Sequence, residues 1–156
     1  MQLPSAVGWA GGHRPASVVA MTTTAAPVER INPTSWSAAF GFDQAQLRPA
    51  PARLLTMSGQ GPVDDTGALL HEDDPAAQIA LAVENVETVL AAAGMDLSDV
   101  LRLTVYATDV DAVLAHFEVL TERLARVGAT PPMSLLGVAR LALPGMLVEL
   151  EITAGR

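Results

Sequence analysis

Cysteine is absent from this sequence of 156 residues, and aromatic side chains make up only 4% of it. The lack of cysteine excludes disulfides, thiolate metal sites and a cysteine nucleophile. Because aromatic residues are scarce, the core must be built from Ala, Val, Leu, Ile and Met. Half of the residues are hydrophobic and 17% are charged. This composition is typical of a globular protein and predicts neither a disordered chain nor a membrane-spanning one.

Basic residues are also few: 9 Lys and Arg stand against 17 Asp and Glu, for a formal net charge of −8. A protein with this charge repels phosphate backbones, so we expect no nucleic-acid partner. The three histidines, His13, His71 and His116, do not have the spacing of metal ligands. Glycine-rich phosphate and dinucleotide motifs are missing too. The sequence therefore predicts neither a metal site nor a nucleotide-binding loop.

The first 27 residues mix Gly, Ala, Pro, Ser and Thr without helical or strand periodicity. This composition predicts a mobile arm, or an extension upstream of a start at Met21, followed by one domain over residues 28–156. Pro4 and Gly8 interrupt the apolar stretch of this segment, and no Lys or Arg precedes it, so a secretory signal is not indicated. We expect a cytoplasmic protein.

Periodicity predicts two helices. The first begins with Asp74 as N-cap and Pro75 at its first position, and it ends at Gly94. The second begins at Asp109 or Asp111 and ends before Gly128. Each carries an apolar stripe at helical spacing: Ile79, Val83, Val86 and Leu90 in the first, and Val113, Phe117, Leu120, Leu124 and Val127 in the second.

Alternating or short apolar runs predict strands over residues 53–58, 100–107, 133–141 and 146–153, with a weaker one over 28–32. The order of these elements predicts an α+β fold in which two helices cover one face of one sheet. Depending on register, the other face carries Leu54, Thr56 and Ser58, or Leu55 and Met57.

That second face is not consistently charged, which bears on the state of assembly. Burying several hundred Å² of it is worth on the order of 10 kcal/mol before entropic costs, at about 25 cal/mol per Å². We therefore predict that it contacts further copies of the chain. A homo-oligomer follows, with binding clefts between protomers.

Glu149 and Glu151 project from the same face of the last predicted strand, opposite its apolar positions. Two interpretations stay open. The strand pattern alone favours two solvated glutamates on a half-exposed strand. Alternatively, one carboxylate lies in an interface cleft, where desolvation would make it a proton carrier for a bound water.

Ser58 ends a predicted strand, and it precedes Gly59, where the backbone can approach a ligand closely. Thr56 and Gln60 stand where a Gly-x-Ser-x-Gly nucleophile elbow has its glycines, which favours a plain strand-ending serine. His116 lies beside the apolar stripe of the second helix, so we expect it at the surface.

Five segments resemble the RidA/YjgF family of reactive intermediate deaminases, also labelled L-PSP endoribonuclease. They span residues 30–154 in the family's order and spacing. The segments are SGQGP at residues 58–62, VENV at 83–86 with AAG ending at 94, TVYATD at 104–109, VARL at 138–141 and LVELE at 147–151.

The resemblance implies a chorismate-mutase-like α+β fold assembled as a homotrimer, with three clefts between subunits. Well-known members hydrolyse enamines and imines to 2-keto acids and ammonia, without metal or organic cofactor. In these members water attacks the imine carbon and an arginine holds the substrate carboxylate. A glutamate of the family is similar in position to Glu149, and Ser58 with Gly59 is retained.

The sequence departs from the family pattern at the cleft. Met133 falls on the deaminase arginine of the Pro-Ala-Arg-Ser motif, and a thioether cannot pair with a carboxylate. Phe42 falls on a cleft tyrosine, Phe117 on a cleft asparagine, and Leu135 on a position that is often small or polar. Arg140 is no simple substitute, since seven residues along a strand place it on the face opposite Met133. These substitutions are compatible with a cleft that has become apolar and with one that has filled in.

Three functions follow as hypotheses. The first is a trimer that binds a small neutral molecule of carbonyl or imine type, in which Glu149 orients water for hydrolysis and the backbone at Ser58 and Gly59 holds a ligand oxygen. The second is classical enamine or imine deamination, which needs an arginine such as Arg48 or Arg53 to reach the cleft. The third is a ligand-binding or scaffold trimer without turnover. The acidity of the chain counts against ribonuclease activity.

Overall fold

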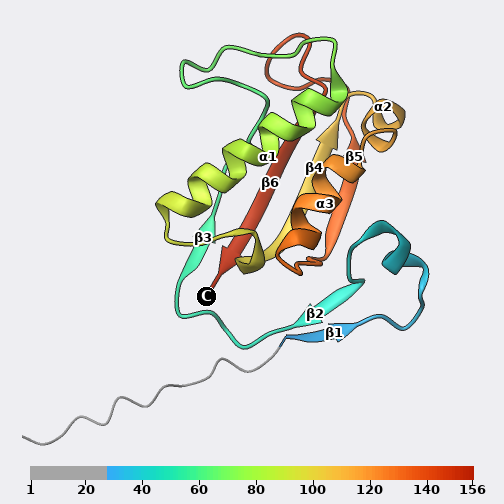
Figure 1. Cartoon of the computed structure of the whole chain (residues 1–156), viewed down its shortest axis with the longest axis vertical. Helices are drawn as coiled ribbons and strands as arrows, with labels where there is room; N and C mark the ends of the chain where they lie inside the picture. Colours follow the sequence, from blue (N-terminus) through green and yellow to red (C-terminus); the bar gives the residue numbers. More distant parts are fainter. Residues whose placement is uncertain (1–27) are drawn as a thin grey trace, which may run out of the picture.

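The computed structural model describes residues 28–156, so the arm predicted for residues 1–27 lies outside the described residues. Over these residues the fold is α+β, with three α-helices and a mixed four-stranded sheet, as the sequence predicted in outline (Figure 1). The strands are β3 (Leu54–Thr56), β6 (Val148–Gly155), β4 (Val100–Ala107) and β5 (Met133–Gly137), in that order across the sheet. β4 and β5 run parallel, whereas β6 is antiparallel to β3 and to β4.

Helix α1 (Pro75–Ala92) confirms the first predicted helix. The Asp74 carboxylate accepts a hydrogen bond from the backbone N–H of Ala77, which satisfies a donor that the first turn leaves free. At the other end Gly94 adopts a positive φ of 70°, the conformation in which glycine ends a helix at little cost.

The prediction of one continuous second helix was wrong. The chain forms α2 (Val110–Leu114) and α3 (Glu118–Arg126), separated by a turn. Around this turn the N–H groups of His116, Phe117 and Leu120 each bond to the carbonyl three residues back, which winds the chain more tightly than an α-helix. Phe117 lies in this turn, half-buried and packed against the core. His116, expected at the surface, is half-buried in this turn.

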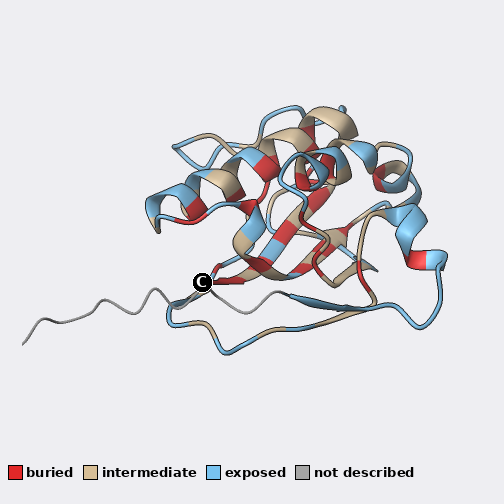
Figure 2. Cartoon of the chain, turned by 60° about the horizontal axis from the view of Figure 1, so that its bottom comes forward, coloured by how far each residue is buried: buried red, intermediate tan, exposed pale blue. Residues whose placement is uncertain are grey.

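The helices lie on one face of the sheet and bury its core (Figures 1 and 2). Along β4 and β6 every second side chain points toward them, and these positions are buried, among them Leu103, Val105, Leu150 and Ile152. Within residues 28–156 no helix is both long and apolar enough to cross a bilayer.

The opposite face of the sheet carries no helix within residues 28–156, and it has the first of the two predicted registers. Leu54 and Thr56 are exposed there, whereas Met57 is buried. Arg102 and Glu151 are also exposed on this face, and Tyr106 and Glu149 are half-buried. Leu54 is 62% exposed and Leu136 46% exposed, so the face combines a few charges with uncovered leucines.

Strand β5 is shorter than predicted. Its last pair is Ala107 with Gly137, and β4 ends at Ala107, so no strand remains for residues 138–141 to pair with. Arg140 therefore lies in an exposed loop, and the strand argument about its face does not apply. The final strand, β6, is shifted by two residues from its predicted range of 146–153.

The N-terminal strand does not join the main sheet. β1 (Glu29–Ile31) lies within the predicted range of 28–32, but it pairs with a strand that the sequence did not predict, β2 (Ala45–Leu47), in a separate two-stranded sheet. A 3₁₀ helix, η1 (Trp36–Phe40), lies in the connection, and another, η2 (Leu97–Asp99), precedes β4.

A buried carboxylate ties this hairpin to the rest of the chain. Asp43 is 1% exposed and accepts hydrogen bonds from Arg30, Asn32, Gln46 and the hydroxyl of Thr130. Burial alone would raise the pKa of Asp43, but these donors outweigh it and lower the pKa to about 2. Because Thr130 lies three residues before the start of β5, this network holds the loop after η1 close to the start of β5.

Candidate functional site

The three predicted residues Ser58, Gly59 and Glu149 lie together at one place, which we call the glutamate corner. After β3, Met57 bonds to Ile152 and Gln60 pairs with Leu150, so Ser58 and Gly59 are two residues opposite one on β6. This is a β-bulge, a device that redirects a strand locally. Both bulge residues are exposed.

Glu149 points toward this bulge. Its carboxylate lies over Gly59 so closely that a Cβ atom at residue 59 would overlap Oε1. The absence of a side chain at this position therefore makes room for the carboxylate. Asn85 of α1 supports the loop that follows, donating hydrogen bonds of 2.9 Å to the carbonyls of Gly61 and Val63.

Glu149 and Glu151 are not equivalent. The hydroxyl of Tyr106 on β4 donates a 2.7 Å hydrogen bond to Glu151, and this bond is the main cause of a raised pKa for Tyr106. Tyr106 itself stands directly opposite Glu149 in the ladder. One carboxylate is thus held by a neighbouring strand, whereas the other projects over the bulge.

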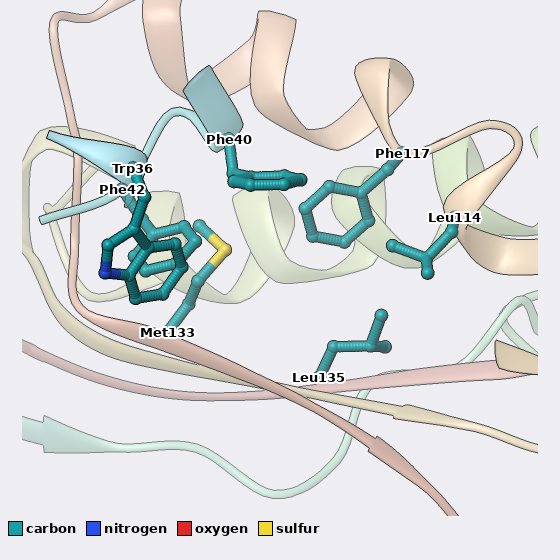
Figure 3. A pocket seen from close by; sticks show the side chains of 7 residues that line it. All are labelled: Trp36, Phe40, Phe42, Leu114, Phe117, Met133 and Leu135. Carbon is teal, nitrogen blue, oxygen red and sulfur yellow. The ribbon is translucent and has the colours of Figure 1, made fainter. Parts of the chain in front are cut away.

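The other four predicted residues, Phe42, Phe117, Met133 and Leu135, also lie together, at a second place that we call the aromatic pocket. It has a volume of about 180 Å³. Figure 3 shows side chains converging on it from η1 and the loop after it, from α2 and the turn before α3, and from β5. The lining residues are Trp36, Phe40, Phe42, Leu114, Phe117, Met133 and Leu135.

The side chains that line the aromatic pocket leave a cavity between them. Three rings form one wall: the centroids of Trp36 and Phe42 are 5.5 Å apart at 77°, and Phe40 lies 6.4 Å from Phe42. Phe117 and Leu114 approach from the helical side. Within a single protomer, the space between these residues is lined by apolar side chains alone.

Sequence reasoning missed Trp36, Phe40 and Leu114. A compositional signal was available for the first two, since the chain has only six aromatic residues and three of them fall between residues 36 and 42. Leu114 gave no signal, because its orientation depends on the break between α2 and α3.

The glutamate corner and the aromatic pocket lie on opposite faces of the sheet. Met133 and Leu135 pair with Leu103 and Val105, which are buried beneath the helices. Glu149 lies between the buried Val148 and Leu150, so its side chain points the other way. Within one protomer the sheet therefore separates the two groups.

The two arginines proposed as substitutes for the one missing at position 133, Arg48 and Arg53, are engaged elsewhere. Arg53 donates to the carbonyl of Ala93 at the end of α1, and Arg48 donates to the side chain of Gln46. Within residues 28–156, no group of His, Asp or Glu side chains is arranged to hold a metal ion.

Comparison with known proteins identifies the family. A family model described as Endoribonuclease L-PSP matches residues 37–155. The chain belongs to the RidA/YjgF family. This Rid family membership agrees with the resemblance carried by the five sequence segments.

Relatives of known sequence and structure support the assignment. The chain is 35% identical over 108 residues to the 2-iminobutanoate/2-iminopropanoate deaminase of Salmonella typhimurium, covering 66% of this chain and 80% of that protein. It is 35% identical over 105 residues to Protein DfrA of Myxococcus xanthus, covering 65% and 76%.

Two solved structures show the same fold. The Rid family protein YyfB from Yersinia pestis matches with a TM-score of 0.69 and 33% identity, over 83% of this chain and 98% of that one. TdcF from E. coli, solved with bound serine, matches with a TM-score of 0.61 and 31% identity, over 74% and 87%.

Proposed function

We propose that the protein binds a small carbonyl or imine compound that lacks a carboxylate, in a cleft between protomers of a homotrimer, and that Glu149 activates water for hydrolysis there. The observation that carries this proposal is the aromatic pocket, whose lining residues include no charged side chain. Relatives of the chain include an imine deaminase, and one related structure holds serine.

The separation of the two groups supports a cleft shared by two chains. Within one protomer, the glutamate corner and the aromatic pocket face away from each other across the sheet. In a cyclic assembly, the glutamate corner of one protomer meets the aromatic pocket of the next. The uncovered leucines on the open face and on the edge strand β5 supply apolar area for such contacts.

Hydrolysis needs one group that moves protons, and Glu149 fits this role. Its carboxylate takes a proton from water as the oxygen attacks the imine carbon, and the electron pair of the C=N bond moves to nitrogen. That proton is given to the nitrogen, which completes the carbinolamine. The carboxylate then takes the proton of the carbinolamine hydroxyl and passes it to the same nitrogen, so the C=O bond forms as the C–N bond breaks. The products are a carbonyl compound and ammonia, so no redox partner is required.

The residue at position 133 determines which substrate class is bound, and Met133 favours a different class from that of the classical deaminase. A carboxylated imine brings a negative charge that must be paired once it is desolvated, and Met133 offers no donor. In the pocket that charge would meet aromatic and aliphatic side chains alone. We therefore expect neutral imines to be preferred over 2-imino acids.

The test is ammonia release from neutral imines and from 2-iminopropanoate, using wild type, Glu149→Gln and Glu151→Gln. Neutral imines should be hydrolysed faster, and Glu149→Gln should slow this about 100-fold or more, as for loss of a general base. Glu151→Gln, two residues along the same face, is the matched control and should retain activity. Equal rates for Glu149→Gln and wild type would contradict the mechanism. Saturable binding without ammonia release would instead favour the non-catalytic trimer.

A further inference from the structure

We propose that the aromatic pocket receives a positively charged group of its ligand, namely an alkylated ammonium or a protonated imine. This inference deepens the proposed function, on which it rests, because an imine without a carboxylate becomes a cation once its nitrogen is protonated. The first observation is compositional. Four of the six aromatic residues in the chain line this single pocket, from two segments more than 70 positions apart.

Aromatic rings favour cations over other charged groups. The face of each ring carries a negative quadrupole, and several faces around one site attract ammonium groups that have been stripped of water. Trp36, Phe40 and Phe42 pack edge to face or tilted, with centroid distances of 5.5 to 6.4 Å. Figure 3 shows these three rings and the ring of Phe117 gathered around the same space.

The charged residues near the pocket also favour a cationic ligand. An adjoining groove between η1 and α3 shares Phe40 and Phe117 with it, and the charged residues that line this groove are Glu118 and Glu122. The whole chain has a formal net charge of −8. A cation approaching the pocket is therefore attracted at long range, whereas an anion is repelled.

Size and chemistry narrow the ligand class. At about 180 Å³, the pocket is smaller than the roughly 300–1,000 Å³ of sites for drug-sized molecules. It suits a compact group such as a trimethylammonium or a branched iminium. In the proposed assembly, Glu149 of the neighbouring protomer adds a further carboxylate beside the cation. A protonated imine is also the form whose carbon water attacks most readily.

Binding of three probes of nearly equal shape tests the inference: choline, its neutral carbon analogue 3,3-dimethylbutan-1-ol, and 3,3-dimethylbutanoate. The protein is used as the full chain with Trp9→Phe, so that Trp36 is the only tryptophan. Its indole N–H signal then reports binding beside the pocket. Choline should bind about fivefold to thirtyfold tighter than the alcohol, as a partly to fully desolvated cation–π contact supplies. The carboxylate should bind weakest.

One variant distinguishes the electrostatic contribution of an aromatic ring to binding from the contribution of its apolar contact area. Phe40→Leu keeps a large apolar side chain but removes one quadrupole, and Phe40 is 51% exposed, so the fold should tolerate the change. The advantage of choline over the alcohol should fall, while binding of the alcohol changes little. Leu47→Ala, at an exposed position on β2, is the control and should leave the advantage intact.

Three results would overturn the inference: equal or tighter binding of the alcohol, tightest binding of the carboxylate, or no change of the Trp36 signal with any probe. Separate results would contradict the proposed function. If neutral imines are hydrolysed in a Glu149-dependent way but choline is not preferred, the proposed hydrolysis stands and the cation site is contradicted. If choline is preferred but no imine is hydrolysed, the cation site stands and the proposed hydrolysis is contradicted.

Discussion

The carboxylate of Glu149 rests on the backbone of Gly59, in the space that a side chain at residue 59 would occupy. This contact predicts the effect of Gly59→Ala. The added methyl group should displace the flexible end of Glu149, so hydrolysis should fall at least tenfold while the folded chain loses less than about 1 kcal/mol. Paired assays of ammonia release and urea unfolding on wild type and variant measure both effects. Ser58→Ala, which adds no bulk, is the matched control, and unchanged activity in Gly59→Ala would show that the carboxylate position does not matter.

Met133→Arg should change the substrate preference. An arginine there brings a bidentate donor into the aromatic pocket, where a substrate carboxylate can pair with it. We expect kcat/KM for 2-iminopropanoate to rise at least tenfold and that for neutral imines to fall. The control is Leu136→Arg, which adds the same charge on the opposite face of β5. If both variants respond alike, net charge rather than the pocket governs the preference.

Asp43 makes stability depend on pH in the acid range. Its pKa in the folded protein is about 2, against a usual value of 3.8. The folded state therefore favours the charged form, and the stabilisation is present above pH 3.8 and lost as the pH falls through 2. The shift corresponds to about 2 kcal/mol.

Asp43→Asn should accordingly lower the free energy of unfolding by about 2 kcal/mol at pH 7, with a smaller difference from wild type below pH 3. Urea unfolding at several pH values measures this. The same substitution at Asp65, an exposed residue of the 64–67 turn, should have little effect. A difference that stays constant from pH 7 to pH 2 would contradict the role of the Asp43 charge.

Tyr106 is the only tyrosine in the chain, so its titration can be followed by absorbance. Its hydrogen bond to Glu151 should raise its pKa above the usual 10.0. Glu151→Gln removes the negative acceptor and should lower the pKa toward 10.0. The measurement applies over the pH range in which far-UV circular dichroism is unchanged. Identical titrations of wild type and variant would show that the bond is absent in solution.

The parts of the fold that the sequence predicted are those with local signals. Helix α1 has its cap, its first proline and its terminating glycine within 21 residues, and the structure follows all three. The α2–α3 break had no such signal, because Phe117 fits the apolar stripe of a continuous helix equally well. Strand β2 is three residues long, too short for a periodicity to show.

The candidate site was predicted in pieces for a similar reason. Family resemblance supplied Phe42, Phe117, Met133 and Leu135, and these do converge on one pocket. The resemblance did not show that Glu149 lies on the other face of the sheet. This arrangement follows from the pairing of β4 with β5 and with β6. Asp43 went unnoticed because the residues that hold it lie up to 87 positions away.

The central claim is that the glutamate corner of one protomer meets the aromatic pocket of another, and the lack of cysteine makes it directly testable by cross-linking. Ser58→Cys places a thiol at the glutamate corner and Leu114→Cys places one at the pocket rim, and each variant carries no other thiol. The two variants are mixed, refolded together and treated with a short bismaleimide. They should then give a covalent dimer on a denaturing gel. A chain carrying both changes should give a species of three times 16.2 kDa. Only single chains in both experiments, with a particle mass of one protomer in solution, would contradict the account.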